Sequence, residues 1–301
     1  MPDSPAPIRV GTSGWSYDDW QGIVYPARPH PHDELRYLAS YLGALEVNSS
    51  FYRTPAPAMT ASWIRRTADL KDFRFTFKMN RRFTHERAPW TPAEAREFHD
   101  CLAPVADADR LGAVLLQFPW SFRADESAYE WLHRLAEEFR RWPLVLEVRH
   151  DSWLRDEALY SLDLLKLSLA SIDQPDLNHC IRPAALSTGP IGYVRLHGRR
   201  RDTWFAENVS PHERYNYLYS PQELDEWIER IRDLSRKSRE VYVFTNNHYR
   251  GQAPANAFQI MARLTGGRVP VPDPMLAAFP FLDQIAAPPD ALPGRQGDLF
   301  R

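Results

Sequence analysis

Short segments rich in β-branched and aromatic residues alternate along this chain with longer segments of helical periodicity. This alternation is typical of repeated βα units, whose strands form a parallel sheet covered by helices. A chain of 301 residues is long enough for eight such units in one domain. The pattern therefore predicts an α/β fold, a single-domain TIM-like (β/α)8 barrel. The expected strands are centred near Val10, Val47, Phe77, Leu116, Leu146, Ala170, Val194 and Val243.

Two helices have clear start signals. Thr91-Pro92-Ala93-Glu94 and Ser220-Pro221-Gln222-Glu223 each combine an N-cap hydroxyl, a proline in the first turn and an acid three residues later. After the second signal, apolar residues recur at intervals of three and four, so one helix face is expected to pack on the barrel. Trp227 belongs to that face, and we expect it to be a packing residue without a further function.

Two stretches fit the barrel pattern poorly. Residues 174–190, between the sixth and seventh expected strands, show no clear helix, so closure of an eight-stranded ring assumes one there. From about Pro270 the sequence is rich in proline, which predicts an irregular, partly mobile tail. The expected organisation is an N-terminal extension (residues 1–7), a barrel domain (residues 8–268) and a Pro-rich C-terminal tail (residues 269–301).

Charge and cysteine content argue against several classes of protein. The formal net charge of −2 is unlike that of a protein that coats nucleic acid by bulk positive charge, although a local basic stripe is still compatible with it. Cys101 and Cys180 form no C-x-x-C pair, which argues against a disulfide framework and a thiolate zinc site. The chain starts without a basic and apolar leader, and no apolar run is long enough to span a bilayer. We therefore expect a cytoplasmic protein without a membrane partner.

Several strands carry polar residues where a barrel interior normally carries aliphatic ones. In the fifth strand Leu144, Leu146 and Val148 share one face, which places Glu147 and Arg149 together on the inward face. Because unpaired buried charges are very costly, such convergence predicts a polar pocket at the C-terminal ends of the strands, where barrel enzymes hold their catalytic groups. The other polar residues expected at this level are Glu46, Asn48, Ser50, Thr76, Lys78, Asn80, Gln117, Asp173, Arg195, His197 and Asn246.

A purely structural role for these groups is the alternative. Glu46 with Lys78, or Glu147 with Arg149, could be ion pairs that only satisfy buried charges. His197 could equally be a core histidine.

The sequence requires no cofactor. Glu46, Glu147, Asp173 and His197 offer ligands that suit Mn²⁺, Mg²⁺ or Zn²⁺, but their spacing matches no metal motif and nearby Arg and Lys would repel a cation. A divalent metal is therefore the lesser option, and no metal ligand is assigned. P-loop, dinucleotide-binding, zinc-protease and nucleophile-elbow signatures are missing, and Gly11-Thr12-Ser13-Gly14 is only a weak indication of a turn that holds an anion.

Aromatic and arginine residues follow the same strands. Arg guanidinium groups bind phosphate or carboxylate with two parallel hydrogen bonds, and indole rings stack on bases or sugars. Their combination at the mouth suits a nucleotide, a single-stranded nucleic acid or a phosphosugar. Ordinary packing of the indoles against the barrel is the alternative. The residues concerned are Trp15, Trp20, Trp120, Trp153 and Trp204, together with Arg81, Arg82, Arg149, Arg199, Arg200, Arg201 and Arg250.

These strand ends also match a known family in their local sequence. The matching segments are Val10 to Trp15, Glu46 to Tyr52, Lys78 with Phe83-Thr84-His85, Leu116 to Pro119, Glu147 to His150 with Ser152-Trp153, Tyr193 to Gly198, Tyr217, and Asn246-Asn247-His248 with Ala253, Pro254 and Asn256. In these segments, which span residues 8 to about 265, the chain resembles the YecE-like family, the domain of unknown function 72. The resemblance implies a TIM-like barrel and brings no established reaction. Thr245 stands where an aromatic residue is expected, and residues 174–190 match poorly.

The strand register and the resemblance together define the candidate site. The catalytic candidates are Glu46, Lys78, Glu147, Asp173 and His197. The substrate-binding candidates are Ser13, Trp15, Asn48, Tyr52, Gln117, Arg149, His150, Trp153, Arg195, Tyr217, Asn246 and Asn247.

The chain ends in a second kind of motif. Gln296-Gly297-Asp298-Leu299-Phe300-Arg301 follows a Pro-Gly pair and resembles a sliding-clamp-binding peptide. In such peptides a Leu-Phe pair enters an apolar groove and the glutamine anchors the segment, here Gln296, Asp298, Leu299 and Phe300 as partner-binding residues. A chance match, or packing of the tail on its own barrel, is the alternative.

Three functions are compatible with this sequence. The leading hypothesis is an enzyme of nucleic-acid metabolism, such as a repair hydrolase or nuclease, that holds a phosphate-bearing substrate with Arg149, Arg195 and Lys78. Glu147 or Glu46 would then act as general acid or base, with His197 as the partner group. A sugar-phosphate or other small-molecule isomerase or lyase is the first alternative, because a barrel fold decides no chemistry. The second is a noncatalytic nucleic-acid-binding module delivered to DNA by its tail.

Overall fold

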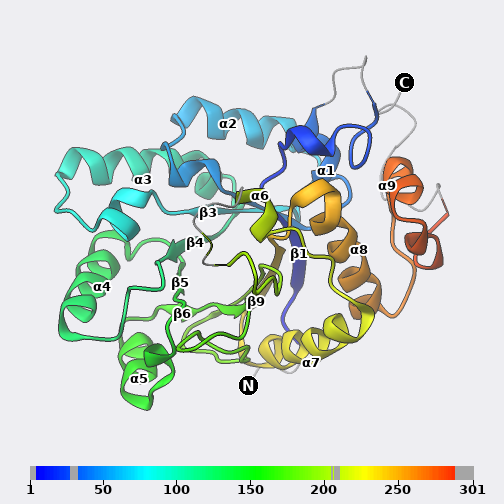
Figure 1. Cartoon of the computed structure of the whole chain (residues 1–301). Coiled ribbons are helices and arrows are strands. Elements are labelled where there is room, and N and C mark those ends of the chain that lie inside the picture. The colour runs from blue at the N-terminus through cyan, green and yellow to red at the C-terminus, as the bar shows by residue number, and fades with distance from the viewer. Residues whose placement is uncertain (1–4, 28–32, 205, 207–210, 289–301) are drawn as a thin grey trace.

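Nine parallel strands form one sheet with the order β6-β5-β4-β3-β2-β1-β9-β8-β7 in the computed structural model, which describes residues 5–27, 33–204, 206 and 211–288. The two strands at the ends of this order, β6 and β7, follow each other in the chain, so the sheet curls into a nearly closed barrel (Figure 1). The expected TIM-like barrel is confirmed. The strands are β1 (Ile8–Ser13), β2 (Ala44–Val47), β3 (Arg74–Lys78), β4 (Leu111–Gln117), β5 (Leu144–Glu147), β6 (Ser168–Leu169), β7 (Ser171–Asp173), β8 (Ile191–Leu196) and β9 (Glu240–Thr245).

The sixth expected strand is divided in two at Ala170. Its first part, β6, pairs with β5, and its second part, β7, pairs with β8. Between them the amide of Ala170 still donates to the carbonyl of Leu146, at 2.8 Å. The nine strands therefore correspond to the eight of the sequence pattern, with the sixth shared between two neighbours.

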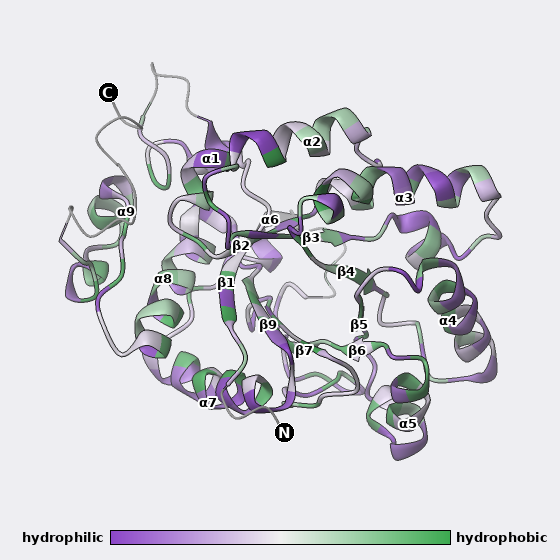
Figure 2. Ribbon diagram, turned by 180° about the vertical axis from the view of Figure 1, so that it is seen from behind, coloured by the Kyte–Doolittle hydropathy of each residue, from purple (hydrophilic) through white to green (hydrophobic). Residues whose placement is uncertain are grey.

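Helices surround the strands on the outside (Figure 1). Hydrophobic and hydrophilic residues alternate around the longer helices (Figure 2), as expected for helices with one face on the barrel. Both expected start signals are reciprocal capping boxes, Thr91 with Glu94 and Ser220 with Glu223. The helices are α1 (Glu34–Ala39), α2 (Pro57–Arg66), α3 (Pro92–Asp107), α4 (Glu126–Phe139), α5 (Asp156–Leu164), α6 (Pro211–Arg214), α7 (Pro221–Lys237), α8 (Gln252–Thr265) and α9 (Asp273–Ala278).

The helix assumed between the sixth and seventh expected strands is absent from residues 174–190, all of which the structure describes. Pro175, Pro183 and Pro190 each remove a backbone donor, which disfavours a helix there. The segment instead folds back on the end of β5, where the amide of Ile181 donates to the carbonyl of Arg149 at 2.8 Å. The barrel nearly closes without this helix because β7 reaches β8 directly.

The first part of the expected irregular tail is ordered. Residues 273–278 form α9, and a 3₁₀ helix follows at Pro280–Gln284. Met275 and Leu282 are buried in the core, and Val269 bridges to Ala286, so this segment packs on the barrel. The prediction of irregular structure is therefore wrong for residues 273–284. Residues 289–301, including the whole clamp-like peptide, lie outside the described residues.

None of the described helices has the length and apolar composition needed to cross a membrane.

The inside of the barrel changes from apolar to polar along its axis. Large rings, among them Tyr242 of β9, fill the part nearer the strand starts. At the C-terminal level the inward positions carry ionisable groups, in agreement with the strand alternation. The Gly11–Gly14 segment does not form the anion-holding turn suggested by its sequence: Gly11 and Ser13 belong to β1, and the amide of Gly14 donates to the carbonyl of Glu46.

Replacement of Gly11 by alanine is expected to destabilise the barrel strongly. A Cβ at this position would lie 1.9 Å from the carbonyl oxygen of Ala44, so strands β1 and β2 would have to separate. We expect a loss of about 3 kcal/mol or more in the free energy of unfolding, measured by urea denaturation. Gly267→Ala is the control, because nothing lies within 4 Å of its added Cβ; equal stability of both variants would contradict the close β1–β2 approach.

Candidate active site

Arg195 is the centre of the polar cluster at the C-terminal end of the barrel. It lies on β8, and its guanidinium is almost completely buried. Nη2 donates to Oε1 of Glu46 at 2.6 Å, and Nη1 donates to Oε2 of Glu147 at 2.6 Å. Both carboxylates are fully buried, so one guanidinium bridges the acids of β2 and β5 across the barrel.

Two hydroxyl groups hold Glu46 in addition to its ion pair with Arg195. The hydroxyl of Ser13 donates to its Oε1 at 2.6 Å, and the hydroxyl of Tyr193 donates to its Oε2 at 2.7 Å. Tyr193 in turn contacts the hydroxyl of Thr76 at 3.0 Å. Glu46 therefore accepts three hydrogen bonds, and it pairs with Arg195 and not with Lys78 as the structural alternative suggested.

Glu147 is surrounded by two guanidinium groups and one imidazole N–H. Besides Arg195, Nη2 of Arg149 donates to its Oε1 at 2.8 Å, and Nε2 of His197 lies 3.3 Å from the same oxygen. Burial alone would raise the pKa of this carboxyl, but Arg195, His197 and Arg149 outweigh burial and hold the pKa well below its usual range. Glu147 is therefore a carboxylate at neutral pH.

His197 is a buried neutral imidazole. The side-chain amide of Asn246 lies 2.8 Å from its Nδ1, which leaves the ring proton on Nε2, facing Glu147. In this tautomer the 3.3 Å contact between Nε2 and Nη2 of Arg149 joins two donors and is not a hydrogen bond. Burial, followed by the charge of Arg149, lowers the pKa of His197 to about 3.

Lys78 is the ammonium group of the cluster without an acidic partner. It is the last residue of β3, and its Nζ lies 4.0 Å from the centre of the Phe51 ring. In the part of the chain that the structure describes, no carboxylate oxygen lies within 4.0 Å of Nζ of Lys78, the distance limit for an ion pair. Burial, followed by the charge of Arg195, lowers the pKa of Lys78 to about 7.

Arg149 lies at the outer edge of the cluster and is half-buried. Its guanidinium stacks on the ring of Trp204, with 5.2 Å between the guanidinium carbon and the ring centre. Nη1 reaches Oε1 of Gln174 only at 3.4 Å. Gln174 belongs to the segment that replaces the assumed helix, so this segment forms the wall of the site beside Arg149.

Asp173 lies outside this cluster, contrary to the sequence prediction. It pairs directly with Leu196 in the β7–β8 ladder, whereas Arg195 pairs with Ile172, so Asp173 faces the helices and not the interior. Its carboxylate accepts from Nε of Arg199 and, at 2.8 Å, from Nε1 of Trp227. Burial raises the pKa of Asp173. Trp227 therefore has a polar contact as well as the expected packing role.

Several aromatic candidates lie away from the cluster. Trp20 and Trp153 are fully buried, and their indole N–H groups donate to the carbonyls of His248 and Phe122. These two side chains pack the barrel and do not line its mouth. Tyr52 has the opposite environment, since 74% of its surface is exposed.

Other candidates bind neighbouring backbone or side chains. The amide of Asn247 donates to the carbonyl of Tyr217, whose hydroxyl donates to Glu223 at 2.5 Å. The amide of Gln117, inside the barrel, donates to the carbonyl of Phe118. Trp15 and Asn48 are half-buried, and Trp15 packs edge-on against Trp63.

Most of the other arginines at the mouth already have acidic partners. These ion pairs are Arg81–Glu86, Arg82–Glu94, Arg199 with Asp173 and Glu223, and Arg200 with Asp202 and Glu213.

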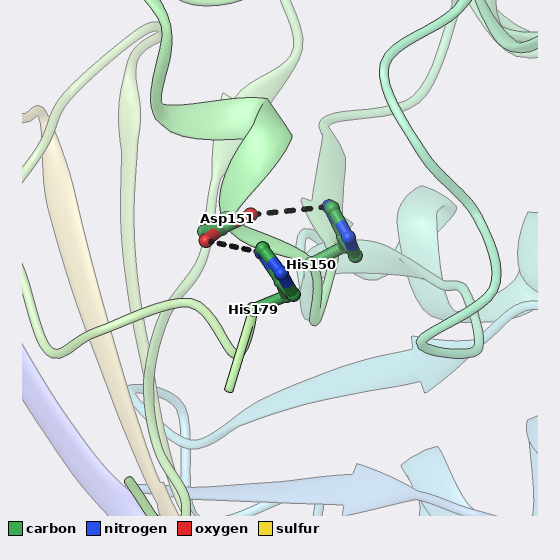
Figure 3. A group of neighbouring side chains, drawn as sticks. All are labelled: His150, Asp151 and His179. Atoms are coloured by element: carbon green, nitrogen blue, oxygen red, sulfur yellow. Dashed lines mark hydrogen bonds and ion pairs between the residues drawn. The ribbon is translucent and has the colours of Figure 1, made fainter. Parts of the chain in front are cut away.

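His150 forms a second group with Asp151 and His179 (Figure 3). Asp151 and His179 also line a hollow of about 740 Å³. The two imidazoles stack nearly parallel, and Nδ1 of each lies 3.3 Å from an oxygen of Asp151. However, Nδ1 of His150 accepts the backbone N–H of Ser152, which places the ring proton on Nε2. His150 therefore offers no free lone pair to a metal in this arrangement.

Comparison with known proteins places the chain in a family. The sequence family described as "Protein of unknown function DUF72" matches residues 9–277. This chain belongs to the DUF72 family. A relative of the DUF72 chain, the UPF0759 protein YunF of Bacillus subtilis, is 26% identical over 271 residues, which cover 85% of this chain and 94% of YunF. The family description names no reaction.

Solved structures support the DUF72 barrel. A DUF72 family protein from Thermotoga maritima has 34% identity and a TM-score of 0.78, and the match covers 86% of this chain and 99% of that one. A second, from Enterococcus faecalis, has 25% identity and a TM-score of 0.75, covering 86% and 95% of the two chains.

Three residues that lie beside the polar cluster around Arg195 are not among the candidates predicted from the sequence. Tyr193 shares a strand face with Arg195, so strand alternation could have identified it. Phe51 and His85 lie in matched segments, and their rings contact each other at 4.8 Å. Their position beside Lys78 depends on the turns that follow β2 and β3, which have no periodic pattern.

Glu147→Gln is expected to destabilise the DUF72 barrel at neutral pH. The neutral amide leaves Arg195 and Arg149 with one uncompensated buried charge, which costs about 3–5 kcal/mol. Because the pKa of Glu147 is lowered on folding, its contribution is present above the unfolded-state pKa and is lost as the pH falls through the folded-state pKa. Urea denaturation at neutral and acidic pH measures both effects, and the difference from wild type should shrink in acid.

Glu229→Gln is the matched control, because Glu229 forms an exposed ion pair with Arg232 on α7. We expect it to cost less than about 1 kcal/mol. Equal losses in the two variants would show that the buried bridge has no special energetic role.

Proposed function

We propose that this DUF72 barrel is an enzyme that acts on a phosphate-bearing substrate at the C-terminal end of its strands, with Lys78 as general acid–base and Arg149 as anion ligand. The observation that carries the proposal is the amine of Lys78, which has a pKa of about 7 and no carboxylate partner among the described residues. General acid–base groups work best when their pKa lies near the working pH.

The roles differ from those suggested by sequence because the other groups are already committed. Both terminal nitrogens of Arg195 donate to carboxylates, so this residue supports the site from beneath. The low pKa of Glu147 makes this carboxylate a poor base, and His197 stays neutral. Lys78 and Arg149 are the two cationic groups left to meet a ligand.

The charges of the cluster favour an anionic substrate. Arg195 and Arg149 balance Glu46 and Glu147, so protonation of Lys78 gives the cluster one net positive charge. A phosphate group bound beside Arg149 favours the protonated amine and is in turn favoured by it. Substrate binding and protonation of Lys78 are therefore coupled.

The substrate class supported by the surroundings is a small phosphate-bearing molecule, such as a sugar phosphate or nucleotide. A polynucleotide needs a stripe of unpaired basic groups. At this mouth Arg81, Arg82 and Arg199 are ion-paired, which weakens the case for a repair hydrolase or nuclease on long nucleic acids. Arg149, held against the ring of the buried Trp204, supplies a donor to a compact ligand.

Inorganic sulfate tests this proposal, because it mimics phosphate and keeps a constant charge across neutral pH. We expect sulfate affinity to fall about tenfold, or about 1.4 kcal/mol, as the pH rises from about 6 to about 8.5 and Lys78 loses its proton. Isothermal titration calorimetry measures the affinity. Lys78→Arg should remove the pH dependence and keep binding, because guanidinium stays charged.

Arg149→Gln should weaken sulfate binding at all these pH values, whereas Arg232→Gln, on the exposed face of α7, should not. Absence of sulfate binding, or unchanged affinity in Arg149→Gln, would overturn the anion site.

The C-terminal sequence favours a separate association with a DNA sliding clamp, mediated by Gln296, Asp298, Leu299 and Phe300. Calorimetric titration of a clamp with the full chain and with a chain that lacks residues 296–301 tests it. We expect the full chain to bind the clamp and the truncated chain not to bind it. A Leu299→Ala, Phe300→Ala variant should bind with at least about tenfold lower affinity than the full chain, since the apolar pair supplies the buried contacts. Binding by neither form would refute the association.

A further inference from the structure

We propose that Lys78 is a nucleophile that forms an imine with an aldehyde or ketone group of its substrate. This inference rests on the proposed function and specifies the substrate further, as a carbonyl compound that also bears an anionic group. The carbonyl carbon would lie at Nζ of Lys78, and the anionic group at Arg149.

The backbone around Lys78 is rigid, which a nucleophile requires for aim. The carbonyl of Lys78 accepts the hydroxyl of Ser50 at 2.6 Å. The following amide, of Met79, donates to the carbonyl of Leu115 at 2.9 Å. The side chain therefore starts from a fixed point at the end of β3 and extends over the face of Phe51.

Burial, followed by the charge of Arg195, favours the neutral form of the Lys78 amine. On one side Nζ lies over the Phe51 ring, a contact that by itself attracts the ammonium form, and this ring packs nearly perpendicular to the imidazole of His85. The burial of His85, followed by the charge of Lys78, lowers the pKa of His85 to about 4, so this neighbour is also uncharged at neutral pH. An amine without a carboxylate partner can lose its proton and attack, whereas an ion-paired lysine is held as ammonium.

The chemistry uses only the amine and the carbonyl compound. The neutral amine of Lys78 adds to the carbonyl carbon, and proton transfer from nitrogen to oxygen gives a carbinolamine. Protonation and loss of the hydroxyl as water then give the iminium ion, in which nitrogen carries the positive charge. Glu46 and Glu147, whose fields favour the ammonium form of Lys78, favour this cation as well.

The lysine content of the chain makes this amine unusual. The sequence has four lysines and 33 arginines. Lys71, Lys166 and Lys237 are exposed, so Lys78 is the lysine inside the barrel. Arginine forms nearly all the ion pairs, and it cannot be deprotonated in proteins. Lys78, at the mouth of the barrel, is a cation that can lose its proton.

Reductive trapping with glyoxylate tests the imine. Glyoxylate carries an aldehyde and a carboxylate, and cyanoborohydride delivers hydride to the C=N bond, which leaves a carboxymethyl group on the amine. The full-length protein is treated at neutral pH, and each lysine is quantified by peptide mass spectrometry. We expect Lys78 to be labelled at least about tenfold faster than the exposed lysines, because they are almost fully protonated at this pH.

Two variants give matched controls. Arg149→Gln should slow labelling of Lys78 more with glyoxylate than with propionaldehyde, which has no anionic group and reports only the change in the pKa of Lys78. Lys78→Arg should lose the label, while Lys71, Lys166 and Lys237 react as before, and its sulfate binding reports that the site is folded.

Labelling of Lys78 no faster than that of the exposed lysines would overturn the imine. If sulfate affinity still depends on the protonation of Lys78, the acid–base function stands without the nucleophile. If the pH dependence of sulfate binding is missing but Lys78 is trapped selectively, the acid–base role falls and the nucleophile stands.

Discussion

The bridge from Arg195 to Glu46 and Glu147 is the interaction on which this site depends. Two carboxylates inside one barrel would repel each other and lose their hydration, a combination that costs several kcal/mol for each ion. The buried guanidinium supplies one hydrogen bond to each acid at 2.6 Å and so compensates both. Ser13 and Tyr193 complete the set of donors around Glu46.

Because the same bridge pairs both acids with Arg195, it leaves Lys78 without a carboxylate partner among the described residues. Glu147 attracts a second cation, Arg149, and the neutral His197 lies beside both. Lys78 then stands near two guanidinium groups with both acids already paired, and burial removes the water that would stabilise its charge. The lowered pKa of this amine thus follows first from burial and then from the guanidinium charges beside it, and the chemistry proposed for the site rests on that arrangement.

Sequence reasoning located the barrel and much of its polar level because both depend on periodicity. Alternation placed Glu147 and Arg149 on one face, and the two capping boxes marked α3 and α7. It failed for Asp173, because the apolar residues Leu169 and Ile172 lie three positions apart and alternation therefore does not indicate which face of this strand points inward. It also could not show that Arg195 would pair with both acids, because alternation gives the level of a side chain and not its partner across the barrel.

Other features had no signal in the local pattern. The pKa of Lys78 depends on burial and on the charges of residues far away in the sequence, such as Arg195. The packing of Met275 and Leu282 on the barrel was hidden in a proline-rich segment, although proline in the first turn is compatible with short helices such as α9.

Because the sixth strand is divided, the ion pair of Arg195 with Glu147 also helps to hold the barrel closed. The strand ladders that close the barrel are short here, because β6 pairs with β5 through two residue pairs and β7 pairs with β8 through three. Glu147 ends β5 and Arg195 belongs to β8, so their ion pair fastens together the two strands on either side of this link. A change in the charge of Glu147 would therefore loosen the wall of the barrel beside Arg149, which couples the electrostatics of the site to the closure of the fold.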